Sequence, residues 1–404
     1  MLSGSPQELI VKIDLTAAHT KRTKRSPLNL SVVLDRSGSM SGAKIEQARQ
    51  AACGLVDQLS AGDIFSLVTY SSGVEMLIPA QAVEDKEALK RAISRIRSDG
   101  NTALYAGVEK GAEELERYFS HKKINRIILL SDGLANSGPS STSDLRRLGQ
   151  RLANRGMSVT TIGLGDDYNE DLMAGLAEAS DANYYYVKDT EKLPEIFAKE
   201  LGELLTVVAR DVRIEIICPE GVTPLGLVGR TEKFENRKAS VTLSQFTPGQ
   251  NRYLLLRCLV KENKPEVARV NVSYKDELDS GSESLANGLV KISFTKDQDA
   301  AKKSRNNTVI AQKVLMETAI AKDEATAQAD SGKLREAAAT LQKQEKKLKE
   351  VYSLAPAAEQ RQIRTETDNL KTFNSAVTRG SYDSATRKDV QSQSYNMRNS
   401  KTSP

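Results

Sequence analysis

The feature that most constrains the fold is a regular alternation of two kinds of segment between residues 28 and 206. Short runs rich in aliphatic and β-branched residues recur at 30–35, 64–70, 126–132, 158–163 and 183–187. They lack strict polar–apolar alternation, as expected for strands that are covered on both faces. Helical segments are expected between them, near 42–60, 85–97, 103–120, 142–155, 169–180 and 190–205. This order predicts an α/β domain built on a doubly wound parallel sheet, with a short antiparallel edge strand at 74–78.

A different periodicity follows residue 206. Apolar and polar residues alternate at 212–218, 268–274 and 290–294, and turn-forming residues separate the runs. Short strands at this spacing predict an antiparallel β-sandwich. The segment Leu9–Leu15 alternates in the same way but has no neighbouring strand of its own, so we place it in the sandwich. The α/β domain is therefore predicted to be inserted in the sandwich or followed by it.

The last quarter of the chain has helical periodicity. Leu334, Leu341 and Leu348 fall on one stripe, and helices are expected near 305–329, 334–352 and 357–376. Beyond Val377 the sequence is rich in Ser, Thr, Asn, Gln and charge, which is typical of disorder. The expected division is an N-terminal strand that joins the sandwich (1–27), the α/β domain (28–206), the sandwich (207–298), a helical hairpin or bundle (299–378) and a disordered tail (379–404).

Composition argues against several classes of function. The formal net charge is +5, from 58 basic and 53 acidic residues, and there is no tryptophan. Such a balanced chain, poor in aromatic residues, does not resemble a nucleic-acid binder. Three cysteines without a CxxC spacing and two distant histidines, His19 and His121, favour neither a disulfide framework nor a zinc site.

The sequence contains no segment that is typical of membrane insertion. No stretch of 18 apolar residues occurs, and the apolar residues of Met1–Leu15 are interrupted by Lys12 and Asp14. We therefore expect no membrane span and no signal peptide within this sequence, and a cytoplasmic location. Secretion after removal of an earlier signal remains an alternative.

The most informative segment is Asp35-Arg36-Ser37-Gly38-Ser39, directly after a buried strand. It places a carboxylate and two hydroxyls at alternate positions at the carboxyl end of a strand, where open α/β sheets bind ligands. Oxygen ligands suit a hard cation such as Mg²⁺, which takes six of them and usually keeps several waters. One carboxylate and two hydroxyls are too few to complete that shell.

Two further loops offer the missing oxygens. Thr102 lies just before an expected helix, and Asp132 ends another buried strand. Because all three loops belong at the same edge of a doubly wound sheet, their side chains should meet there. The remaining ligands would come from water and from a binding partner.

The five residues, in this order and context, resemble the metal-ion-dependent adhesion site of von Willebrand factor type A (VWA) domains. The flanking segments LVTYSSGVEMLIP (67–79), GNTALYAGV (100–108), LLSDGLAN (129–136) and IGLGDDYN (162–169) agree with it, so that the resemblance covers roughly 28–206. The order of strand, VWA domain, sandwich and helices also resembles stand-alone bacterial VWA proteins.

The resemblance implies a metal site with Asp35, Ser37, Ser39, Thr102 and Asp132 as ligands, direct or through water. It implies Mg²⁺, with Mn²⁺ or Ca²⁺ as alternatives, and a protein partner whose Asp or Glu side chain completes the shell. A first shell of low negative charge leaves the ion attractive to an incoming carboxylate. We therefore expect a binding protein without catalytic residues and without an organic cofactor.

Other interpretations of the same residues remain. Ser37, Ser39 and Thr102 are also favourable helix caps, although capping leaves Asp35 and Asp132 unexplained. The chain could be a structural or self-assembling protein in which the metal site is incidental. A metal-assisted hydrolase is less favoured, because no histidine lies in the three loops to act as a general base. The partner, the cellular process and the oligomeric state do not follow from the sequence.

Overall fold

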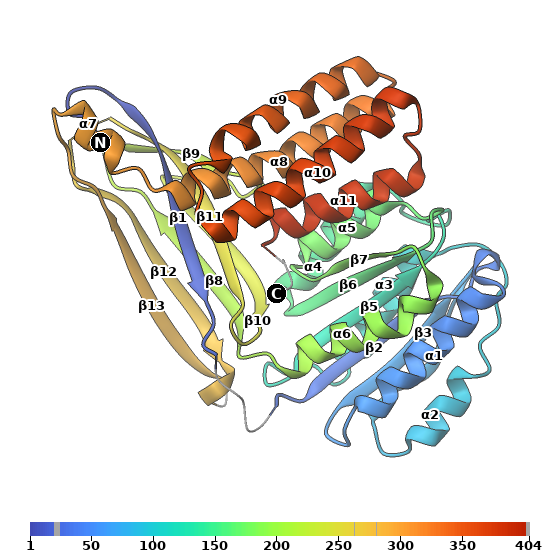
Figure 1. Ribbon diagram of the computed structural model, residues 1–404. Helices are drawn as coiled ribbons and strands as arrows, with labels where there is room; N and C mark the ends of the chain where they lie inside the picture. The colour runs from blue at the N-terminus through green and yellow to red at the C-terminus, as the bar shows by residue number, and fades with distance from the viewer. Residues whose placement is uncertain (20–24, 262, 280, 401–404) are drawn as a thin grey trace.

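The computed structural model describes residues 1–19, 25–261, 263–279 and 281–400 (Figure 1). In these residues a six-stranded sheet has the order β4-β3-β2-β5-β6-β7. All neighbouring strands are parallel except β4, which pairs antiparallel with β3 as expected from the sequence. The strands are β2 (Leu28–Asp35), β3 (Ile64–Tyr70), β4 (Val74–Ala82), β5 (Ile124–Ser131), β6 (Met157–Leu164) and β7 (Tyr184–Val187).

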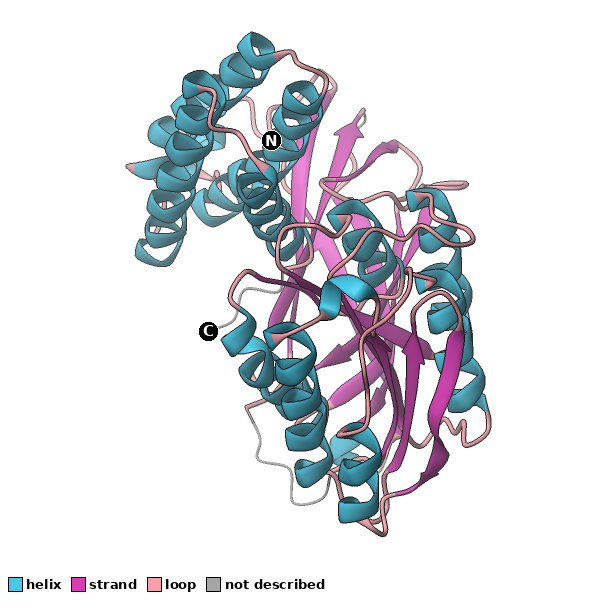
Figure 2. Ribbon diagram, turned by 90° about the vertical axis from the view of Figure 1, so that its right-hand side faces the viewer, coloured by secondary structure: helices cyan, strands magenta, loops and turns pink. Residues whose placement is uncertain are grey.

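Helices cover both faces of this sheet (Figure 2). In β2, the alternate residues Leu30, Val32 and Leu34 pack with residues of α1 and α6, while Val33 packs with residues of α3. Both faces of the strand are thus buried, which explains its continuous apolar sequence. The helices are α1 (Ala43–Gln58), α2 (Lys86–Ile93), α3 (Leu104–Glu116), α4 (Thr142–Asn154), α5 (Glu170–Ala179) and α6 (Leu193–Leu205).

The antiparallel part consists of two sheets with the orders β1-β11-β9 and β10-β8-β12-β13. β1 pairs antiparallel with β11, with Ile13 opposite Leu254, so the first strand of the chain belongs to the sandwich. The α/β domain is therefore inserted between β1 and β8. The strands are β1 (Gln7–Thr16), β8 (Ala209–Ile217), β9 (Val222–Leu227), β10 (Lys238–Phe246), β11 (Asn251–Val260), β12 (Glu266–Asp276) and β13 (Ser282–Lys291).

A helical segment completes the chain and lies beside both the sandwich and the α/β domain (Figure 1). Its long helices share one apolar cluster, which includes Leu315, Leu341, Leu348 and Phe373. The helices are α7 (Gln298–Lys303), α8 (Asn307–Asp330), α9 (Leu334–Tyr352), α10 (Ala357–Arg379) and α11 (Ser384–Arg398).

The prediction of a disordered tail over 379–404 is wrong for most of those residues, because α11 is an ordered helix that packs between α8 and α5. The Asp383 side chain accepts from the Thr386 N–H and caps the helix. Tyr395 is fully buried, and its hydroxyl donates to the carbonyl of Ala182. The helix was not predicted because its sequence is mostly polar. Only a few of its side chains are buried, and these are enough to hold it against its neighbours. Residues 401–404 lie outside the described part of the chain.

We propose the sequence-based division of the chain with this one change, in which α11 joins the helical segment. Among the helices of the described residues, none is both long enough and apolar enough to span a bilayer.

Candidate metal centre

The candidate site lies at the carboxyl edge of the six-stranded sheet, where β2 and β5 end. Asp35 is the last residue of β2, and Ser37 lies two residues further on, in the loop to α1. Ser39 lies in a short 3-10 helix, Gly38–Met40. Thr102 precedes the first turn of α3, and Asp132 follows the last residue of β5.

Four of the five side chains predicted from the sequence lie close together, those of Ser37, Ser39, Thr102 and Asp132. The Oγ atoms of Ser37 and Ser39 are 3.1 Å apart, and Ser39 Oγ donates to Asp132 Oδ1 at 2.7 Å. A Cβ atom added at Gly133 would lie 3.2 Å from Thr102 Oγ1, 3.4 Å from Ser39 Oγ and 3.9 Å from Ser37 Oγ. Three hydroxyls from two separate loops therefore lie beside Gly133, and a larger residue there would enter the same space.

Asp35 contacts this cluster through its neighbours. Its Oδ1 accepts from the Ser37 N–H at 2.8 Å, and its Oδ2 accepts from Ser131 Oγ at 2.8 Å. The side chain is fully buried, and burial raises the pKa of Asp35 to about 6, although these hydrogen bonds oppose the rise. A buried carboxylate with both oxygens hydrogen-bonded fixes the backbone at Ser37, and a nearby cation would stabilise its charge.

Backbone contacts hold the loops in register. The Gly38 N–H donates to the Gly100 carbonyl at 3.0 Å, and the Asp99 N–H donates to the Arg36 carbonyl at 2.7 Å. Gly100 has a φ of +76°, and a Cβ atom there would lie 2.6 Å from Ser72 Oγ. This position therefore requires glycine, both for its backbone conformation and for its close approach to Ser72.

Sequence reasoning missed three side chains that support the site. Lys44, in the first turn of α1, places its Nζ 2.5 Å from Asp132 Oδ2. Ser131 donates to Asp35, and Asn136 Oδ1 accepts from the Thr102 N–H at 2.9 Å. Ser131 and Asn136 lie close to Asp132 in the sequence, and this proximity was the available signal. Lys44 had none, because its reach depends on how α1 leaves the loop.

Burial and chemistry define what this arrangement can do. Asp35, Ser37, Thr102 and Asp132 are buried, whereas Ser39 is exposed and leaves the cluster open to solvent at its side. All five candidate side chains would bind a metal through oxygen, which suits a hard cation such as Mg²⁺. Among the described residues, no group of three or more His, Cys, Asp or Glu side chains could hold a metal, so an imidazole or thiolate site of that kind is absent there.

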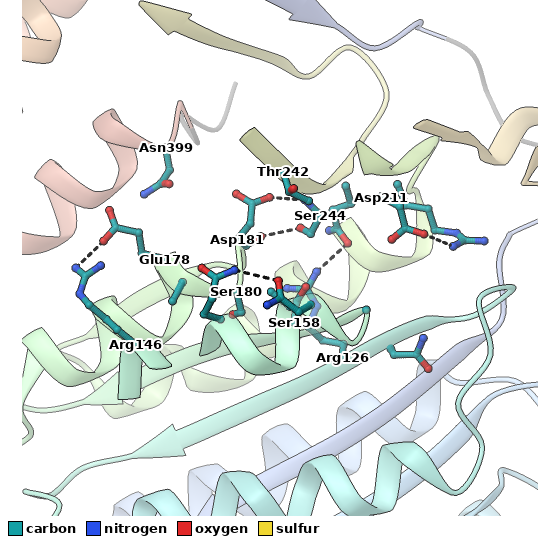
Figure 3. A pocket seen from close by; sticks show the side chains of 18 of the residues that line it. Arg126, Arg146, Ser158, Glu178, Ser180, Asp181, Asp211, Thr242, Ser244 and Asn399 are labelled. Atoms are coloured by element: carbon teal, nitrogen blue, oxygen red, sulfur yellow. Dashed lines mark hydrogen bonds and ion pairs between the residues drawn. The ribbon is translucent and has the colours of Figure 1, made fainter. Parts of the chain in front are cut away.

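A cavity of about 620 Å³ lies at the opposite end of the sheet, between the α/β domain, the sandwich and the end of α11 (Figure 3). Charged and polar groups in its wall are paired with one another. Arg146 forms an ion pair with Glu178 at 2.6 Å, and Arg126 donates to Gln245 at 2.8 Å. His121 also lines this cavity. The cavity is therefore a polar junction between structural units, distinct from the candidate metal centre.

Comparison with known proteins agrees with this geometry. The family model of the von Willebrand factor type A domain matches residues 29–199. This part of the chain is a VWA domain. The match begins within β2 and ends within α6, so the VWA domain includes all three loops that carry the candidate ligands.

Two relatives and one solved structure extend the comparison beyond the VWA domain. The uncharacterised protein sll0103 of Synechocystis sp. is 25% identical over 301 residues, which cover 71% of each chain. YfbK of Escherichia coli, also uncharacterised, is 26% identical over 67% of this chain, which spans only 48% of that relative. A VWA protein from Catenulispora acidiphila has a similar fold, with a TM-score of 0.72 and 19% identity, over 93% of this chain and 91% of that one. The fold of most of this chain, beyond the VWA domain, thus recurs in that protein.

Proposed function

We propose that this chain is a non-enzymatic protein-binding module that depends on a divalent cation. Asp35, Ser37, Ser39, Thr102 and Asp132 would hold Mg²⁺, and a partner's Asp or Glu side chain would complete the shell. The observation that carries this proposal is the meeting of the Ser37, Ser39 and Thr102 hydroxyls around Gly133, beside Asp132. When bound, the ion supplies a positive charge that attracts the carboxylate of the partner.

The residues present fit such an ion. Three neutral hydroxyls and few anionic oxygens would leave much of its charge uncompensated. Asp35 is engaged by Ser37 and Ser131, and Asp132 by Ser39 and Lys44. These contacts favour a role in which the two carboxylates position the hydroxyls and balance part of the charge. The exposed side at Ser39 gives a partner a route to the site.

The alternatives predict different behaviour. A self-assembling protein would keep its contacts when the site is removed. A metal-assisted hydrolase would need a general base close to the ion. Asp35 and Asp132 are already hydrogen-bonded, and His121 lies at the other end of the sheet. Neither alternative is favoured by a specific contact at the site.

Two measurements test the proposal. Calorimetric titration of the full chain with Mg²⁺ and Mn²⁺ should detect one site, and Ser37→Ala should abolish it while Ser143→Ala, on the exposed surface of α4, leaves it intact. Capture of proteins from a lysate of the source organism should then require Mg²⁺ and fail in EDTA. Absence of metal uptake, or a captured protein that is indifferent to both EDTA and Ser37→Ala, would overturn it.

A further inference from the structure

The sandwich ends in a long strand with a free side. β13 is the terminal strand of its four-stranded sheet, and it pairs with β12 along its whole length, from Ser282 to Lys291. Among the described strands, β12 is its only neighbour. Figure 1 shows β13 on the outer margin of the molecule, away from the VWA domain and from helices α8 to α11. Its second edge therefore presents backbone N–H and C=O groups that could pair with another strand.

Two leucines make this edge unusual. Leu285 is 75% exposed and Leu289 is 47% exposed. Val290 packs toward the sandwich core, so the odd-numbered residues of β13 point to the opposite, outward face. On β12 the residues opposite the leucines are Ser273 and Arg269, which offer them no apolar cover. Large apolar side chains left open on an edge strand favour association with a further strand.

The strand also lacks the usual protection against such pairing. Natural edges carry lysines, prolines or bulges along their length, but β13 has one lysine, Lys291, at its end and no proline. The other terminal strand of the same sheet is treated differently. β10 is fastened to the VWA domain, where Ser244 Oγ donates to the Asp181 carbonyl at 2.7 Å and Gln245 accepts from Arg126. One end of β10 is thus held against the VWA domain, whereas β13 lies on the outer margin of the sheet.

The outward face of β13 is complementary to itself. Its residues read Glu283, Leu285, Asn287, Leu289 and Lys291. We propose that β13 pairs antiparallel with β13 of a second copy of this chain, about a twofold axis that passes through Asn287. In this register each Glu283 faces Lys291 of the other copy, and each Leu285 faces Leu289 of the other copy.

No neighbouring register gives the same match. Moving the axis to Ala286 sets leucine against asparagine and glutamate against leucine, and moving it to Gly288 sets leucine against lysine. On the inner face the central register places Ala286 opposite Gly288, so small side chains meet without a clash. Opposite charges on directly opposed residues stabilise antiparallel sheets. The opposed leucines would bury apolar surface that is otherwise exposed. This symmetry favours a second copy over an unrelated peptide, which would have no reason to match it.

The register can be tested with charge exchange. Sedimentation equilibrium of the full chain should show a reversible dimer. Glu283→Lys and Lys291→Glu should each weaken it by about tenfold, because either change sets like charges opposite each other twice per dimer. The combined variant restores both pairs and should restore the dimer. Lys349→Glu makes the same charge change as Lys291→Glu, but on the exposed surface of α9, and it should leave the dimer unaffected.

A cross-link tests the axis independently. Directly opposed residues have Cβ atoms within reach of a disulfide, so Asn287→Cys should give a covalent dimer on mild oxidation. The partly exposed Cys53 is first replaced by serine, while Cys218 and Cys258 are buried. Ser273→Cys, one strand inward, is the control and should remain uncoupled. A chain that stays monomeric, or a dimer that ignores the single charge changes and forms no link at Asn287→Cys, would overturn the proposal.

Discussion

Lys44 and Asp132 form an ion pair at the edge of the candidate metal centre, with Nζ 2.5 Å from Oδ2. The other oxygen of the same carboxylate accepts from Ser39. One buried carboxylate is therefore shared between an ammonium group and the hydroxyl cluster. Lys44 compensates the charge of Asp132, but it also places a positive charge close to the proposed position of a cation.

Removing that ammonium should strengthen metal binding. We expect Lys44→Met to raise the affinity for Mg²⁺ by about three- to tenfold, because the repulsion between two positive charges a few ångströms apart is lost. Calorimetric titration at fixed ionic strength measures the change. Lys110→Met, on the surface of α3, serves as the control. A lower affinity in Lys44→Met would mean that its orientation of Asp132 outweighs the repulsion.

Metal binding should also stabilise the fold. An ion that binds only the folded chain adds about 2.7 kcal/mol to the free energy of unfolding at one hundred times its dissociation constant. The buried carboxylates of Asp35 and Asp132 would gain most from it. Differential scanning calorimetry with Mg²⁺ and with EDTA should show this gain for the wild type and for Ser143→Ala, and none for Ser37→Ala. Equal gains in all three would assign the effect to another site.

Much of the candidate site could be predicted from the sequence, because its residues have a recognisable local spacing. Asp35, Ser37 and Ser39 lie within five residues, and Thr102 and Asp132 stand beside recognisable elements. The strand–helix order then dictates that their loops share one edge of the sheet. The fold of the VWA domain and the place of β1 in the sandwich followed from periodicity in the same way. Such features are visible because neighbouring residues determine them.

Contacts between segments far apart in the chain could not be predicted from the sequence. Lys388 Nζ lies 2.9 Å from Glu170 Oε2, and the two residues are 218 positions apart. Each alone looks like an ordinary surface charge, so the segment around Lys388 was expected to be disordered. The same holds for Tyr395, whose burial depends on the carbonyl of Ala182. Tertiary packing, which no local pattern encodes, orders α11.

The junction between the sandwich and the VWA domain should be sensitive to acid. Asp63 is fully buried, and Arg25 donates to both of its oxygens. Burial alone raises the pKa of Asp63, but the bonds from Arg25 and from the Leu28 and Ser60 N–H groups outweigh it and hold the pKa below its ordinary value. Its contribution is thus present above the unfolded pKa and is lost as the pH falls through the lower folded pKa.

We expect Asp63→Asn to reduce the free energy of unfolding by about 2–3 kcal/mol at neutral pH, because it leaves the charge of the Arg25 guanidinium without its partner carboxylate. The difference from the wild type should shrink in strongly acidic solution, where Asp63 is itself protonated. Urea unfolding at a series of pH values measures both. Asp368→Asn, at an exposed pair on α10, is the matched control. A difference that does not change with pH would refute the assigned charge state.

The last helix should be held to the VWA domain chiefly by one aromatic side chain. Tyr395 is fully buried, its ring contacts Tyr184 edge-on at 5.5 Å, and its hydroxyl donates to Ala182. Truncation to alanine removes that packing and leaves a cavity, which costs about 3–5 kcal/mol for a buried aromatic residue. We expect Tyr395→Ala to release α11, so that limited proteolysis cuts within 384–398 while the VWA domain stays intact. Tyr118→Ala removes a tyrosine that is 43% exposed and should leave the helix protected. Equal protection of α11 in both variants would show that the ion pairs of Arg387 and Lys388 with Glu170 dock the helix without Tyr395.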